Sequence, residues 1–259
     1  MTFVTKRYIN TKFGQIHCRL SGDFSGAVLV MLHQTASSSV MYEALMTALP
    51  QYSIIAPDTP GYGMSFDPAE KVTIPFYSEI LCEVLQSLEI EHCHFFGHHT
   101  GAAIAVQFTH DYPDKVEKLV LSGPPYLSNE QKTSLSRTLS NEDIPADGSH
   151  LQKVWKRIKS RSLTGDTNLI QREVLQTLRA SRYADTYHAV FEQDFAGLLA
   201  EIEHETLVIC GEHDTIRVSA EPTHKALSNS EFIIIPEAGT YICDENTAAL
   251  ADIIREFLV

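Results

Sequence analysis

A glycine-bracketed pentapeptide, GHHTG at residues 97–101, limits the folds that this sequence can adopt. The largely apolar residues 93–96 precede it, and the small and apolar residues 102–106 follow it. This order is typical of a strand, a sharp turn and a helix, in which glycines permit close backbone approach around a strained central residue. A reactive side chain is expected at the centre of such a turn. In this chain, that position holds His99.

Apolar runs alternate with helical patterns along most of the chain. Continuous apolar runs are expected for strands that are covered on both faces, as in a parallel sheet. These apolar runs lie at residues 27–32, 53–56, 93–96, 118–122, 206–210 and 231–235. A hairpin is predicted before them, at residues 6–10 and 15–20. Helices are predicted at residues 40–49, 75–88 and 246–257. The sequence therefore predicts an α/β fold with a mostly parallel central sheet and helices on both faces.

The strand signals cease between residues 126 and 205. Charged, helix-favouring segments fill this interval, at residues 151–161, 168–183 and 186–199. They predict an inserted helical cap over residues 125–203, with a core formed by residues 1–124 and 204–259. The basic side chains of the cap lie at helical spacing, which favours a solvated face over a gate for anions. They are Lys153, Arg157, Arg161, Arg172, Arg179 and Arg182.

Composition disfavours several classes of partner. The net charge of −13 argues against binding to nucleic acid or to an anionic membrane surface, because both need basic patches. No apolar run is long enough to cross a membrane, and the first residues lack a secretory pattern. The five scattered cysteines favour the cytoplasm, and the histidines show no metal-binding spacing. We expect a monomer or homodimer that binds a small molecule, without a cofactor or metal ion.

Two further segments carry a family resemblance. Residues 33–35 read His-Gln-Thr after the first buried strand, and residues 58–65 read Asp-Thr-Pro-Gly-Tyr-Gly-Met-Ser. The second segment is similar to the D-x-x-G-x-G-x-S turn of the α/β-hydrolase superfamily, and residues 97–101 resemble its nucleophile elbow. From about residue 6 to residue 259, the chain is thus similar to α/β hydrolases that carry a cap.

This resemblance implies a set of site residues. The backbone N–H groups of Thr35 and Thr100 stand where the family has its oxyanion-hole donors, which do not depend on side-chain identity. Asp214, after the next-to-last strand, matches the acid of the catalytic triad. Thr240 stands in the place of the triad histidine, and His99 in that of the serine. Both the usual nucleophile and the usual base are therefore missing.

We infer that the imidazole of His99 replaces the missing base. Its ring is expected to lean toward the space that Thr240 leaves, and to reach Asp214 directly or through a water or the Thr240 hydroxyl. A carboxylate beside the ring would hold one tautomer. His99, Asp214 and Thr240 are the predicted catalytic residues. The predicted substrate contacts are Gln34, His98, which is also expected to pack beside the elbow, and Tyr241, whereas His33 is interpreted as a structural residue of its loop.

An imidazole beside a carboxylate and an oxyanion hole predicts a general base that faces a polarised carbonyl. One reaction that fits is the hydrolysis of an ester, amide or activated ketone by water that His99 activates. Another is the removal of a proton from carbon, as in a lyase, decarboxylase or cyclase. Neither passes through an acyl-serine. The alternative is a catalytically inactive hydrolase scaffold that binds a small ligand, which the loss of two triad residues favours.

Overall fold

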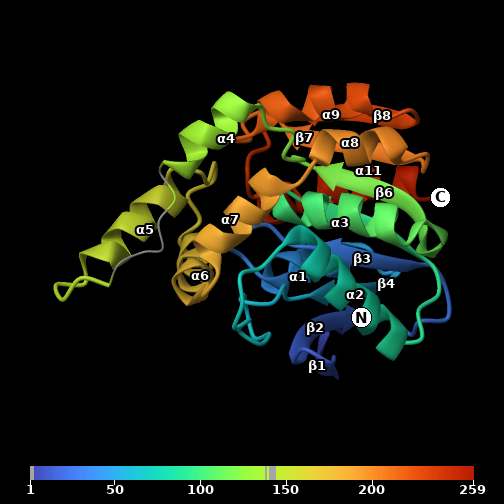
Figure 1. The fold of residues 1–259 in the computed structure, drawn as a ribbon, viewed down its shortest axis with the longest axis horizontal. Helices are drawn as coiled ribbons and strands as arrows, with labels where there is room; N and C mark the ends of the chain where they lie inside the picture. Colours follow the sequence, from blue (N-terminus) through green and yellow to red (C-terminus); the bar gives the residue numbers. More distant parts are fainter. Residues whose placement is uncertain (1–2, 138, 140–143) are drawn as a thin grey trace.

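An eight-stranded sheet forms the centre of this computed structural model, which describes residues 3–137, 139 and 144–259 (Figure 1). The strand order is β1-β2-β4-β3-β5-β6-β7-β8; β2 is antiparallel to both of its neighbours, and all other neighbouring pairs are parallel. The predicted fold class is thus confirmed. The strands are β1 (Thr5–Asn10), β2 (Gln15–Ser21), β3 (Val28–Leu32), β4 (Ser53–Pro57), β5 (Cys93–His98), β6 (Val116–Ser122), β7 (Thr206–Gly211) and β8 (Ser230–Ile235).

The strands in the middle of the sheet are buried along their whole length. Every residue of β3, β4, β5 and β7 is buried, whereas β1 at the sheet edge buries only Ile9. Because helices cover both faces of the central strands, both sets of alternating side chains meet apolar surface. The continuous apolar runs in the sequence have this cause.

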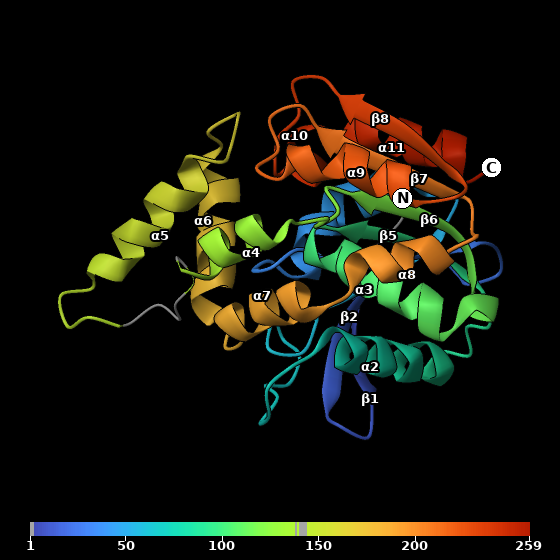
Figure 2. The same ribbon diagram turned by 45° about the horizontal axis from the view of Figure 1, so that its top comes forward.

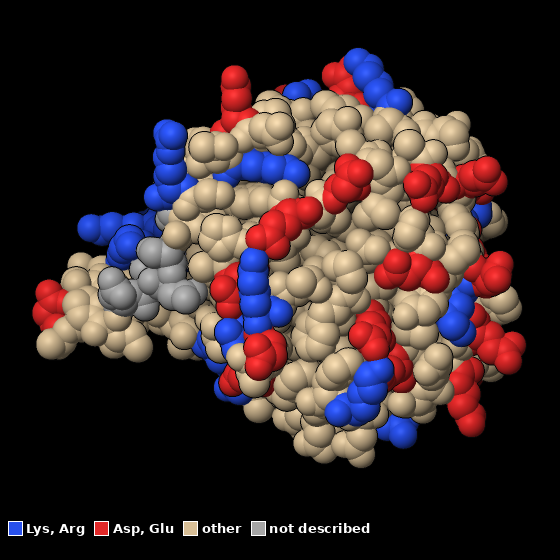
Figure 3. Space-filling model, viewed as in Figure 1, with Lys and Arg blue, Asp and Glu red and all other residues tan. Residues whose placement is uncertain are grey.

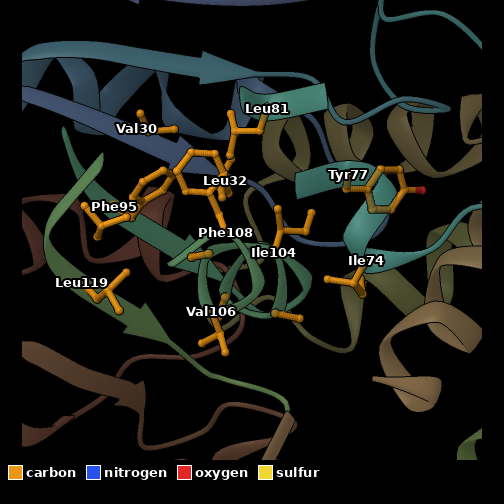
Figure 4. Close-up of a cluster of buried hydrophobic side chains, with 14 of the residues drawn as sticks. Val30, Leu32, Ile74, Tyr77, Leu81, Phe95, Ile104, Val106, Phe108 and Leu119 are labelled. Carbon is orange, nitrogen blue, oxygen red and sulfur yellow. The ribbon is translucent and has the colours of Figure 1, made fainter. Parts of the chain in front are cut away.

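Helices form a layer on each face of the sheet (Figure 2). On one face, α3 (Thr100–Asp111) packs beside α2 (Ile74–Ser87) and α8 (Phe195–Glu201), and Phe108 of α3 meets Phe95 of β5 with ring centroids 5.0 Å apart (Figure 4). On the other face, α1 (Glu43–Ala48) packs against α11 (Thr247–Phe257). The smaller elements are η1 (Ser39–Tyr42), η2 (Pro113–Lys115), η3 (Arg217–Ser219), α9 (Ala220–Ala226) and α10 (Ile242–Glu245).

The first helices after β6 lie at one end of the molecule (Figures 1 and 2). They are α4 (Asn129–Ser136), α5 (Ser149–Lys159), α6 (Thr167–Arg179) and α7 (Tyr183–Glu192), followed by α8. α5 and α6 share a small apolar cluster that includes Tyr241. Arg172 of α6 also binds Asp244 of α10 with two hydrogen bonds of 2.7 Å, so the cap is joined to the core close to the carboxyl ends of the strands.

Several helices differ from their predicted extents. The segment predicted as one helix at residues 186–199 is divided into α7 and α8, because Asp194 caps a new helix by accepting a hydrogen bond from the N–H of Gly197. Helices α4 and α9 were not predicted, although Ser128 and Gln131 form a capping box that marks the start of α4. In the part of the chain that the structure describes, no helix has the length and apolar character needed to span a membrane.

Candidate active site

The turn between β5 and α3 holds His99 in a strained backbone conformation. Its φ of 49° and ψ of −110° are rarely adopted by residues that carry a Cβ. Its N–H donates to the carbonyl of Ser122 over 2.9 Å, and its carbonyl accepts from the N–H of Ala102 over 2.9 Å. A Cβ on Gly101 would overlap the carbonyl oxygen of Leu32, so glycine is required where α3 approaches β3. The predicted strand, turn and helix around His99 are present.

The imidazole of His99 reaches the carboxylate of Asp214 directly. Nε2 of His99 lies 2.9 Å from Oδ2 of Asp214, and the other carboxylate oxygen accepts from the N–H of Ile216 over 2.9 Å. The Asp214 side chain is only 1% exposed. Burial raises the pKa of this carboxyl, but the charge and hydrogen bond of His99 outweigh burial and bring the pKa to about 2. Asp214 is therefore an ionised carboxylate at neutral pH.

This contact determines the tautomer of His99. An ionised carboxylate accepts hydrogen bonds and donates none, so the ring nitrogen facing Asp214, Nε2, carries the proton. In a neutral imidazole the other nitrogen, Nδ1, then keeps a free lone pair. Among the described residues, Nδ1 of His99 has no hydrogen-bond partner. In the Ser-His-Asp triad the carboxylate instead binds Nδ1–H and Nε2 acts as the base, so the ring here is held by its opposite nitrogen.

Gly123, at the end of β6, provides the space that the His99 ring occupies. A Cβ at this glycine would lie 2.6 Å from Cδ2 and 2.7 Å from Nε2 of His99. Gly123 also has a φ of 54°, which disfavours any other residue. No sequence motif assigns Gly123 to the site. Its contact with the site depends on β6 lying beside β5, which the chain order alone does not reveal.

His98 lies against His99 in the interior of the protein. Its ring stacks on that of His99 with centroids 4.2 Å apart, and the side chain is fully buried. Nε2 of His98 donates to the carbonyl of Thr240 over 2.9 Å, so Nδ1 accepts from the hydroxyl of Ser122 over 2.9 Å. Burial, followed by the charge of His99, lowers the pKa of His98 to about 3. The predicted packing beside the elbow is present. This ring lines none of the cavities described below, so they give no support to the predicted substrate contact.

Thr240 occupies the expected position with a different set of contacts. Its carbonyl, and not its hydroxyl, takes part in the histidine network, through His98. Its hydroxyl is buried and has no hydrogen-bond partner among the described residues. Of the expected routes from His99 to Asp214, direct or through a water or this hydroxyl, the structure shows the direct contact.

Thr35 and Thr100 bring two loops together beside His99. The hydroxyl of Thr100 donates to that of Thr35 over 2.9 Å. Thr100 is the first residue of α3, where backbone N–H groups have no partner within the helix. His33 fixes the loop before Thr35, because one ring nitrogen contacts the carbonyl of Gln34 and the other accepts from the N–H of Thr59, both over 2.9 Å. The structural role predicted for His33 agrees with these contacts.

A cavity of about 150 Å³, termed the site cavity, lies between the elbow and the cap. Its wall includes His99, Thr100, Thr35, Gln34 and Thr240, together with residues of the cap. A second, smaller cavity of about 20 Å³, termed the side cavity, shares part of this wall. Tyr241 lines only the side cavity and is 2% exposed, so it lies outside the site cavity where a substrate contact was predicted.

Three of these side chains have the spacing of metal ligands. His98, His99 and Asp214 offer ligand atoms within 4.8 Å of one another. Both ring nitrogens of His98 already bond to protein groups, and the protonated Nε2 of His99 already faces Asp214. A metal ion would have to displace these hydrogen bonds, because a ligating imidazole nitrogen needs a free lone pair. The arrangement fits a hydrogen-bonded network better than a metal centre.

The chain matches the family described as the alpha/beta hydrolase fold over residues 27–247. Because this match covers most of its length, the protein belongs to the α/β hydrolase family. The resemblance inferred from residues 33–35, 58–65 and 97–101 is thereby confirmed at the level of the family.

Curated relatives and solved structures agree with this assignment. Uncharacterized proteins of Mycobacterium tuberculosis and Mycobacterium bovis are 30% identical to this chain over 104 residues. The match covers 40% of this chain and only 30% of the length of those proteins. A 2-(acetamidomethylene)succinate hydrolase of Mesorhizobium japonicum is 22% identical over 268 residues, covering 99% of this chain and 95% of that protein. The enol-lactonase of Burkholderia xenovorans has a TM-score of 0.84 at 18% identity, covering 97% of this chain and 99% of that one, and shares the fold.

Proposed function

We propose that this protein is an enzyme that hydrolyses a small carbonyl compound with His99 as its general base and without an acyl-enzyme. The observation that carries the proposal is the 2.9 Å contact between His99 and Asp214 on the wall of the site cavity. This contact fixes the proton on Nε2 and leaves the Nδ1 lone pair available. Asp214 is then a positioning residue that holds the ring and stabilises its charged form.

The proposed reaction begins when Nδ1 of His99 takes a proton from a water molecule. The resulting hydroxide attacks the carbonyl carbon, and the carbonyl electron pair moves to oxygen. The oxyanion is stabilised by the backbone N–H groups of Thr35 and Thr100, an arrangement that the Thr35–Thr100 hydroxyl contact supports. When the tetrahedral intermediate collapses, the leaving group takes the proton from Nδ1. Water and an ester thus give an acid and an alcohol, and the histidine is regenerated.

The relatives favour hydrolysis over the other reactions that this base can perform. The protein of Mesorhizobium japonicum is named a hydrolase, and the structure from Burkholderia xenovorans is titled an enol-lactonase. Removal of a proton from carbon uses the same base and the same oxyanion hole. It is distinguished by exchange of deuterium from D2O into the carbon next to the carbonyl of recovered substrate, which the proposed hydrolysis does not produce.

Turnover of a panel of small esters and lactones tests the proposal. The wild-type protein is expected to hydrolyse at least one of them, and His99→Gln should lower kcat/KM by about 100-fold or more. His213→Gln is the matched control, because His213 is exposed and, among the described residues, its ring is ion-paired only with Glu212, at 3.9 Å. Equal activity of wild type and His99→Gln would contradict the base. Hydrolysis of no panel member, together with ligand binding, would support a catalytically inactive binding protein.

Covalent chemistry is tested on the same reaction. Intact-protein mass spectrometry after rapid acid quench should show no mass increase during turnover, since no serine occupies the elbow. A fluorophosphonate probe should likewise leave residues 97–101 unlabelled. An acyl adduct within this segment would overturn the proposed mechanism.

A further inference from the structure

One cap arginine faces the site cavity without an ionic partner. Arg161, just after α5, lines both the site cavity and the side cavity. Among the described residues, its guanidinium forms no ion pair, and no other residue on the site cavity wall is an Asp, Glu, Lys or Arg. A guanidinium stays charged at any physiological pH, and a half-buried charge is stabilised by an anionic partner. The expectation that the cap arginines form only a solvated face is therefore wrong for Arg161.

Two further polar groups without partners lie on the same wall. Like Arg161, Gln34 and Thr240 line both cavities, so the three residues lie on the wall that the two cavities share. The Thr240 hydroxyl is buried and unpartnered among the described residues, and Thr240 is only 3% exposed. The side-chain amide of Gln34, which is 5% exposed, also has no hydrogen-bond partner in the described part of the chain. A guanidinium, an amide N–H and a hydroxyl together match the oxygens of one carboxylate.

The acidic residue on the wall of the side cavity already has partners. Glu173 lines the side cavity, but Arg172 contacts it at 2.7 Å and the Ser37 hydroxyl donates to it over 3.2 Å. It is therefore not available to neutralise Arg161. Figure 3 shows acidic side chains spread over the α/β core, with basic side chains more frequent toward the cap end of this face. In a chain of net charge −13, a cationic cavity wall would draw a small anion toward this place.

Another part of the site cavity wall is apolar. Pro125, Leu127, Val190, Phe191 and Ile216 form much of its wall. Such a surface fits a short aliphatic or aromatic substituent. His99 and Thr100 lie on the wall of the same cavity, so a ligand that fills it can contact the base, the apolar wall and Arg161 together.

We infer that the substrate is a carbonyl compound that carries a carboxylate at one end and an apolar substituent at the other. Arg161, Gln34 and Thr240 bind the carboxylate, and the apolar wall holds the substituent. The placing of the carbonyl beside His99 rests on the proposed function. The carboxylate subsite rests on the unpartnered groups alone, so binding can test it without turnover.

The test compares two ligands that differ only in charge. The probes are 5-methyl-4-oxohexanoate, which has a carboxylate, a ketone and an isopropyl group, and its primary amide, which is neutral. Calorimetric titration of the wild-type protein at low salt should show the carboxylate binding about tenfold more tightly than the amide, or more. Added salt should reduce that preference. Equal affinities, or no binding of either probe at millimolar concentration, would overturn the inference.

Variants assign the preference to Arg161. Arg161→Gln should reduce the difference between the two probes to less than about twofold, while Arg161→Lys keeps part of it. Arg179→Gln is the matched control, because Arg179 is an exposed cap arginine at the end of α6 that lines neither cavity. An unchanged preference in Arg161→Gln would contradict the subsite. If that variant does not fold, the comparison of the two probes on the wild-type protein still tests whether a carboxylate subsite is present.

His99→Gln separates this inference from the proposed function. That variant should still prefer the carboxylate probe, because His99 is not part of the carboxylate subsite. Carboxylate preference in a protein that hydrolyses no ester would sustain the subsite and reject the proposed function. Ester hydrolysis that depends on His99, without any preference for the carboxylate probe, would sustain the proposed function and reject the carboxylate subsite.

Discussion

Nε2 of His99 lies 2.9 Å from Oδ2 of Asp214, so the carboxylate holds the ring nitrogen that the usual triad leaves free for catalysis. In the usual triad the imidazole follows β8, and its Nδ1 meets the acid. Here the imidazole stands at the elbow, and its Nε2 meets the acid. The Asp214 carboxylate still holds the histidine ring, and Nδ1 becomes the only nitrogen of His99 with a free lone pair. The remaining features of the site follow from this exchange of positions.

Asp214→Asn should lower activity with little change in fold. An amide presents both a donor and an acceptor, so it no longer selects the tautomer with the proton on Nε2. In a triad the same replacement costs about 10⁴-fold in kcat. We expect a loss of about 100-fold or more in kcat with an unchanged circular dichroism spectrum. A variant that retains wild-type kcat would show that the carboxylate does not position the base.

Gly123→Ala should displace the His99 ring and reduce activity. The new Cβ would lie 2.6 Å from Cδ2 and 2.7 Å from Nε2 of the ring, a contact that requires movement of the side chain or of the turn. Adopting a positive φ also costs an alanine about 1 kcal/mol of folding stability. We expect a loss of activity larger than that stability cost explains, measured as kcat/KM alongside urea unfolding.

Gly165→Ala is the matched control for this prediction. Gly165 also has a positive φ, of 67°, but a Cβ there would meet no atom within 4 Å. Its replacement should carry a similar backbone cost and leave activity unchanged. Equal activity losses in the two variants would mean that backbone strain, and not the contact with His99, causes the effect.

The sequence predicted the strand–turn–helix at His99, the position of Asp214 after the next-to-last strand and the succession of strands along the chain, because buried runs and the family motifs carry local signals. It did not predict the role of Gly123, since that contact depends on β6 lying beside β5. It also did not reveal that Arg161 faces the cavity. Residues at helical spacing share a face, but which face meets the core depends on packing between cap and sheet. The motif placed His99 at the centre of the turn and His98 beside it, and in the structure His98 is buried in the core and His99 lies on the cavity wall.

His98 should make the folding stability depend on pH in the acidic range. An unfolded histidine has a pKa of about 6.5, whereas burial lowers the pKa of His98 in the folded protein to about 3. Between these values the unfolded state binds more protons, so the free energy of unfolding falls as the pH falls. Below about pH 3.8, Asp214 binds a proton in the unfolded state, whereas its pKa in the folded protein is about 2. The free energy of unfolding therefore falls further as the pH falls.

Urea unfolding between pH 7 and pH 4 measures this contribution. His98→Asn removes the titrating group and should make the pH dependence shallower than in wild type, even if its stability at pH 7 is lower. His213→Asn, which replaces an exposed histidine, should keep the wild-type slope. Identical slopes for wild type and His98→Asn would contradict the assignment of a buried neutral imidazole at this position.

The tautomer of His99 is the most direct test of the account, because it can be measured without knowing the substrate. Nitrogen-15 NMR of the histidine rings at neutral pH, assigned with His99→Gln, distinguishes a protonated nitrogen from one with a free lone pair. We expect a proton on Nε2 and a lone pair on Nδ1, with the pattern lost in Asp214→Asn. A proton on Nδ1 with a free Nε2 would contradict the proposed base and the role of Asp214 in holding it.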